Sequence, residues 1–84
     1  MAENEKAARP DLRDMEVLVL GIGASGAAAA RLLLREGARV RCSDSGSGPE
    51  TLRAAASLEA LGCRVETGGH TEGFARGVSL AVIS

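Results

Sequence analysis

The period of apolar positions changes several times along the chain, and these changes predict strands alternating with helices. Residues 15–21 form an almost continuous Val/Leu run that ends at glycine, which is typical of a strand covered on both faces. In residues 24–36 the pattern changes to helical spacing, at Ala28, Arg31, Leu32 and Arg35. Leu33 and Leu34 widen the apolar side, so an amphipathic helix with outward arginines is predicted. We expect Ser25 to cap this helix and Gly37 to end it.

Residues 38–44 predict a second strand with an unusual distribution of charge. Val40 and Cys42 face one side of it, whereas Arg39, Arg41 and Ser43 face the other. A strand buried on both faces would not carry two arginines. We therefore expect one side of this strand to be open, or to be covered only by a loop.

A second helix is predicted to start at Pro49, after a loop rich in Ser and Gly, and to end before Gly62. Its expected inner stripe consists of Leu52, Ala55, Ala56, Leu58 and Leu61. Residues 63–67 and 78–84 predict a third and a fourth strand, separated by a turn and a single helical turn.

The order of these elements indicates an α/β fold. Strands joined by helices of this length run parallel with right-handed crossovers, so we expect a Rossmann-like sheet of about four strands in the order 3-2-1-4. Residues 1–14 are rich in charge and predict a flexible tail, and residues 15–84 predict one domain. Because the chain stops on an apolar strand, we expect a truncated domain, a fragment of a larger protein.

Composition narrows the possible functions. The net charge is −1 and Phe74 is the sole aromatic residue, so neither a basic surface nor a stacking platform for nucleic acid is indicated. No apolar run approaches membrane-spanning length, which argues against a membrane partner. Cys42 and Cys63 are too far apart for a C-x-x-C motif and are interpreted as buried apolar residues in a reducing, cytoplasmic environment.

The strongest chemical signal is the glycine motif Gly21-x-Gly23-x-x-Gly26, placed between a strand and a helix. In such motifs the first glycine permits a tight turn, the second lets the backbone approach a phosphate, and the third lets helix and strand pack closely. Asp44 follows at the distance at which dinucleotide-binding folds hold ribose hydroxyls. A nucleotide site is therefore predicted, the alternative being a turn that only packs tightly.

Catalytic chemistry is not indicated within these residues. His70 follows two glycines in a turn, with no Asp or Ser constellation around it, and we interpret it as a surface loop residue. The chain also lacks the G-x-x-x-x-G-K-[ST] phosphate loop. If the parent protein is an enzyme, we expect its catalytic residues to lie elsewhere.

Three segments together resemble a known family. They are Val-Leu-Val-Leu-Gly-Ile-Gly-Ala-Ser-Gly, the Ser43-Asp44-Ser45 segment, and the Gly68-Gly69-His70 turn that precedes a strand ending at Ser84. Over residues 16–84 the sequence resembles the N-terminal domain of the UDP-N-acetylmuramoyl-L-alanine–D-glutamate ligases (MurD, in the Mur ligase family). In that family the last strand continues into Ser-Pro-Gly, of which only Ser84 is present.

The resemblance implies a Rossmann-like domain that binds the UDP portion of UDP-N-acetylmuramoyl-L-alanine in peptidoglycan precursor synthesis, and hence in cell-wall formation, cell shape and cell division. It places Gly23, Ala24, Ser25 and Gly26 at the diphosphate, Asp44 and Ser45 at the uracil and ribose, and Ser84 at the start of the missing Ser-Pro-Gly loop. It assigns ATP and magnesium to a central domain and D-glutamate to further domains, so this fragment is expected to hold no cofactor and to be inactive alone.

Two other interpretations remain open. The glycine motif and Asp44 would serve equally well in an NAD(P)-binding domain of a dehydrogenase or regulatory protein. The apolar strand at residues 78–83 could also pair with a second copy of the chain, because an unpaired strand edge is a ready association surface.

Overall fold

The computed structural model describes residues 11–84, so most of the predicted tail lies outside the described residues. The elements are β1 (Glu16–Leu20), α2 (Ala24–Arg35), β2 (Arg39–Asp44), α3 (Pro49–Ala60), β3 (Arg64–Thr67), α4 (Glu72–Ala75) and β4 (Leu80–Ile83). The four strands form one parallel sheet in the order β3-β2-β1-β4, which confirms the predicted Rossmann-like topology.

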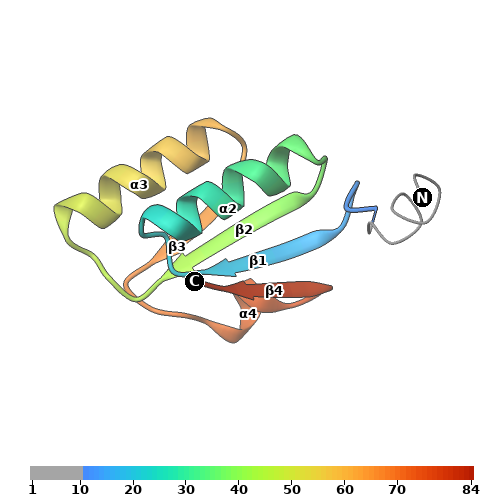
Figure 1. The fold of residues 1–84 in the computed structure, drawn as a ribbon. Coiled ribbons are helices and arrows are strands. Elements are labelled where there is room, and N and C mark those ends of the chain that lie inside the picture. Colours follow the sequence, from blue (N-terminus) through green and yellow to red (C-terminus); the bar gives the residue numbers. More distant parts are fainter. Residues whose placement is uncertain (1–10) are drawn as a thin grey trace.

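The two long helices lie on one face of the sheet, and the short α4 lies on the other (Figure 1). The core between the sheet and the long helices consists of small and branched apolar side chains, among them Val17, Val19, Ile22, Ala30, Leu33, Val40, Cys42 and Leu58. This packing requires no aromatic residue, because alanines on α2 let the helix approach the sheet closely.

The apolar stripes of both helices are narrower than their sequences predict. Leu32 on α2 is 53% exposed, and on α3 Leu52 and Leu61 are 49% and 54% exposed while Ala56 is also exposed. Only Ala55 and Leu58 of the predicted α3 stripe are buried. The reason is that each helix packs on the sheet through a narrow face, so the leucines on either side of that face remain exposed to solvent.

The start of α2 also differs from the prediction that Ser25 caps it. Gly23 is the N-cap residue, with an extended backbone, and no side chain caps the helix. The amide of Ala27 already donates to the carbonyl of Gly23 over 2.8 Å, so the helix begins at Ala24 and Ser25 lies exposed in its first turn. Gly37 and Gly62 end α2 and α3 with positive φ angles of 88° and 109°, as expected.

The second face of the sheet explains the arginines of β2. The guanidinium of Arg41 donates to the backbone carbonyls of Phe74 and Arg76, over 2.9 and 2.6 Å, and to the carboxylate of Glu16 over 3.0 Å. The segment that contains α4 thus covers this face, and the side chain of Arg41 supplies hydrogen-bond donors to its backbone carbonyls. This confirms the prediction that one side of β2 is covered by little more than a loop.

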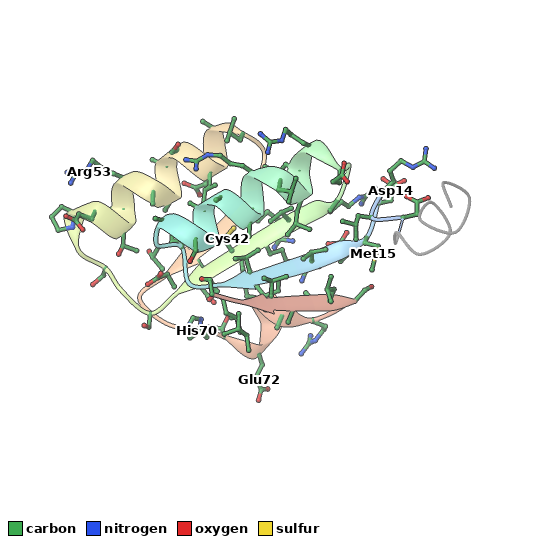
Figure 2. The ribbon with its side chains drawn as sticks, viewed as in Figure 1. Asp14, Met15, Cys42, Arg53, His70 and Glu72 are labelled. Atoms are coloured by element: carbon green, nitrogen blue, oxygen red, sulfur yellow. The ribbon has the colours of Figure 1, made fainter. Side chains whose placement is uncertain are left out.

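The two cysteines are free and buried, as expected. Cys42 lies between the sheet and the helices (Figure 2). Burial, followed by the neighbouring thiol of Cys63, raises the pKa of the Cys42 thiol to about 12, so this side chain is a neutral core residue at ordinary pH. Within residues 11–84, no helix is both long and apolar enough to cross a membrane.

Candidate nucleotide site

The glycine motif forms the turn that leads from β1 into α2, at the carboxyl ends of the strands. Gly21 has a φ of 92°, a conformation that side chains disfavour, and its amide donates to the carbonyl of Ser43 over 2.8 Å. Ile22 is buried in the core and holds the middle of the turn in place. The chain therefore reverses direction within a few residues and is anchored to β2 and to the core.

The third glycine is required by packing. A Cβ atom on Gly26 would lie 1.8 Å from the carbonyl oxygen of Gly21 and 2.7 Å from the hydroxyl of Ser84. By contrast, a Cβ atom on Gly23 would meet no atom within 4 Å. Gly26 thus lets the helix touch the turn, and Gly23 leaves the space in front of the turn open to a ligand.

The start of α2 has the features of an anion site. The first amides of a helix have no partner within it, and the aligned peptide dipoles add about half a positive charge at this end. Gly23, Ala24 and Ser25 are exposed there, with open space in front of Gly23. A phosphate group could accept hydrogen bonds from these amides without displacing any side chain.

Asp44 supports the turn from the neighbouring strand. One carboxylate oxygen accepts the amide hydrogen of Ile22 over 2.8 Å, and the other accepts that of Gly46 over 2.8 Å. These two backbone donors, that of Ile22 first, lower the pKa of the Asp44 carboxyl below its ordinary value. The side chain is therefore an anion that also shapes the turn, a role that sequence spacing alone did not indicate.

Ser84 approaches the same turn from β4. Its amide donates to the carbonyl of Leu20 over 3.2 Å, and its hydroxyl donates to the carbonyl of Gly21 over 3.0 Å. Of the predicted site residues, the structure thus brings together Gly23, Ala24, Ser25, Gly26, Asp44 and Ser84. Ser45 is exposed immediately after β2 and has no contact with the turn among the described hydrogen bonds.

Two polar residues near this end of the sheet were not among the predicted site residues. Ser43 is only 2% exposed, and its hydroxyl lies against the imidazole of the exposed His70. Glu66 at the end of β3 accepts hydrogen bonds from the amide and hydroxyl of Thr71, which lower the pKa of its carboxyl. Two features of the sequence could have indicated these residues. One is the presence of Ser43 within a strand, and the other is the Gly-Gly-His turn that follows Glu66 and Thr67.

Hollows elsewhere on the surface do not coincide with the glycine turn. A shallow cavity of about 370 Å³ lies among Arg31, Leu34, Arg35 and Leu61, and another of about 430 Å³ lies at the start of α3. Within residues 11–84, no group of three or more His, Cys, Asp or Glu side chains is placed to hold a metal ion.

No family model matches the chain. In structure, the chain is similar to SirC, a precorrin-2 dehydrogenase, with a TM-score of 0.67 and 23% identity over 92% of this chain and 37% of that one. A bacillithiol disulfide reductase from Bacillus cereus matches 70% of this chain and 20% of that protein, with a TM-score of 0.54 and 27% identity. The likeness to SirC supports the fold alone.

In sequence, the matches are to ligases. The UDP-N-acetylmuramoylalanine–D-glutamate ligase of Frankia casuarinae is 58% identical over 55 residues, 66% of this chain and 12% of that protein. The ligase of the same name from Koribacter versatilis is 43% identical over 74 residues, 88% of this chain and 16% of that protein. The chain therefore spans less than a fifth of the length of these relatives. By sequence it belongs with the UDP-N-acetylmuramoylalanine–D-glutamate ligase family, and it corresponds to a segment of its members.

Proposed function

We propose that this chain binds the UDP portion of UDP-N-acetylmuramoyl-L-alanine, as the first domain of an ATP-dependent ligase that adds D-glutamate during peptidoglycan precursor synthesis. The observation that carries the proposal is the open N-terminus of α2. Gly23 leaves space for an anion there, and Gly26 lets the helix approach the turn closely. The sequence identity to ligases named for this substrate supports UDP as the nucleotide.

In this arrangement the amides of Ala24, Ser25 and Gly26 bind the diphosphate, and Asp44 and Ser45 lie beside the nucleoside. The depressed pKa of Asp44 keeps its carboxylate charged, so it can accept hydrogen bonds from ribose hydroxyls while it holds the turn. The chain orients and holds its ligand. We assign the bond-forming step, which uses ATP, magnesium and D-glutamate, to other parts of the ligase. We therefore expect no ligation by this chain alone.

The test is a titration of the ¹⁵N-labelled chain, followed by ¹H–¹⁵N correlation spectra. UDP-N-acetylmuramoyl-L-alanine and UDP should shift the amides of residues 23–26, and pyrophosphate should shift the same amides more weakly because it lacks the nucleoside. NADH serves as the comparison ligand, since the glycine motif and Asp44 keep an NAD(P) site as the second candidate. Shifts with NADH and none with UDP would replace the proposed function by that candidate.

A further inference from the structure

The imidazole of His70 is held in one orientation by the buried end of β2. The hydroxyl of Ser43 lies 2.5 Å from Nδ1 of His70 and 3.2 Å from the carbonyl oxygen of Gly69. His70 lies on the side of the sheet away from α2 and α3, close to the carboxyl ends of the strands (Figure 2). An exposed loop histidine would have no reason to adopt a single orientation, but this one is tied to a residue that is almost fully buried.

These two contacts fix the tautomer of the ring. A hydroxyl group has one hydrogen, and the other two partners of the Ser43 hydroxyl, the carbonyl of Gly69 and the carboxylate of Glu66, can only accept, so Ser43 donates to one of them. Nδ1 of His70 must then carry a hydrogen and donate it to the oxygen of Ser43. In the neutral ring this leaves Nε2 without a hydrogen, as an acceptor, and His70 as a whole is exposed.

The same serine connects His70 to the glycine turn. The backbone carbonyl of Ser43 accepts the amide of Gly21, and its side chain holds the imidazole. His70 is also close enough to the carboxylates of Asp44 and Glu66 to help lower the pKa of each. Two neighbouring carboxylates disfavour a phosphate at this position, whereas an acceptor nitrogen suits a hydroxyl or N–H donor.

We propose that His70 is a further binding residue of the nucleotide site, and that its Nε2 atom accepts a hydrogen bond from a hydroxyl or N–H group of the bound nucleoside. Ser43 is its positioning residue. This inference rests on the proposed function, because it takes the glycine turn as the phosphate end of the same ligand. It assigns a ligand contact to a loop that the sequence alone marks only as a turn.

Two substitutions separate the two nitrogens of the ring. In His70→Asn the side-chain amide can replace Nδ1 against Ser43 but does not extend to the position of Nε2. In His70→Gln the longer side chain places its polar atoms near the position of Nε2. The affinity of each variant for UDP, measured by calorimetry, should fall about fivefold for His70→Asn and less for His70→Gln, as expected for one hydrogen bond. Affinity for pyrophosphate should not change in either variant.

The wild-type chain provides a measurement that does not depend on folding of the variants. A long-range ¹H–¹⁵N spectrum of the imidazole should show the Nδ1-protonated tautomer in the free chain, and UDP should shift the Nε2 resonance while pyrophosphate should not. If UDP shifts residues 23–26 but leaves the imidazole and the affinity of His70→Asn unchanged, His70 has only a structural role and the inference is wrong. If UDP shifts neither region, the proposed function itself fails.

Discussion

The carboxylate of Asp44 accepts the amide hydrogen of Ile22 over 2.8 Å, so the end of β2 holds the glycine turn of the neighbouring strand. Its second oxygen accepts the amide of Gly46 over 2.8 Å. Asp44→Asn leaves one acceptor oxygen for two donors, and removes the charge that strengthens both bonds. We expect this variant to lose about 1–2 kcal/mol in its free energy of unfolding, measured in urea. Asp11→Asn is the control, because Asp11 is exposed and its carboxylate pairs with the neighbouring Arg13, away from the glycine turn.

The lowered pKa of Asp44 predicts that the free energy of unfolding depends on pH. The folded pKa of Asp44 lies below the ordinary value of 3.8, so its contribution is complete above that pH and is lost as pH falls through the folded pKa. Urea midpoints measured between pH 7 and pH 3 should therefore drop at the acid end, and Asp44→Asn should flatten part of this drop. An unchanged pH profile in the variant would contradict the role of the carboxylate in the turn.

Alanine at the second glycine of the motif should affect ligand binding, whereas alanine at the third should affect folding. In Gly26→Ala the new Cβ atom would overlap the carbonyl of Gly21, at 1.8 Å, and backbone cannot yield as a side chain would. We expect a loss of at least about 3 kcal/mol, or failure to fold. Gly23→Ala places its Cβ atom in open space and should fold normally, by circular dichroism and urea unfolding. It should nevertheless bind UDP more weakly, because the methyl group occupies the ligand side of the turn.

Arg41 is expected to be the main link between the sheet and the α4 segment. Arg41→Met keeps much of the apolar stem but removes the donors to Phe74, Arg76 and Glu16, and should destabilise the chain by about 2 kcal/mol. Amide hydrogen exchange in residues 72–79 should accelerate more than exchange in α2. Arg39→Met is the control: its side chain is 70% exposed and lies 3.8 Å from Glu16, so little change is expected. Equal effects of the two variants would show that the α4 segment is held by other contacts.

The free edge of β4 should promote self-association. β4 pairs with β1 on one side only, and Leu80 and Ile83 are 40% and 80% exposed. We expect sedimentation velocity to show a larger species as the concentration rises, and Ile83→Lys to suppress it, because a charge on an edge strand opposes pairing. Leu32→Lys changes another exposed apolar side chain, on α2 and away from the sheet edge, and should have no effect. A monomer at all concentrations would rule out this use of the edge.

The topology of the sheet could be predicted because it depends on features of short sequence segments. The continuous Val/Leu run before Gly21 and the helix-length spacers between strands leave few parallel arrangements, and the order β3-β2-β1-β4 follows. The exposure of Leu52 and Leu61 could not be predicted in the same way. Helical periodicity shows which side is apolar, but the width of the covered stripe depends on which neighbours exist.

The candidate site could be predicted only in part, because spacing along the chain indicates contacts within one motif but not contacts between different elements. The contact between Gly26 and Gly21 is built into the motif, so spacing alone indicates it. The contact between Ser43 and His70 joins a strand to the loop after another strand, and only the pairing of β3 beside β2 brings them to the same end of the sheet. A side-chain contact of this kind follows from topology and has no signature in local sequence.

The central position of β1 has a consequence for the order of folding. Pairing β1 with β2 closes a loop of roughly 23 residues, whereas pairing it with β4 closes one of roughly 63, which costs about 1 kcal/mol more in chain entropy. The β1-α2-β2 unit should therefore form early, with the glycine turn already shaped by Asp44. Ser84 can reach the carbonyl of Gly21 only after β4 docks. The glycine turn therefore gains its hydrogen bond from Ser84 late in folding.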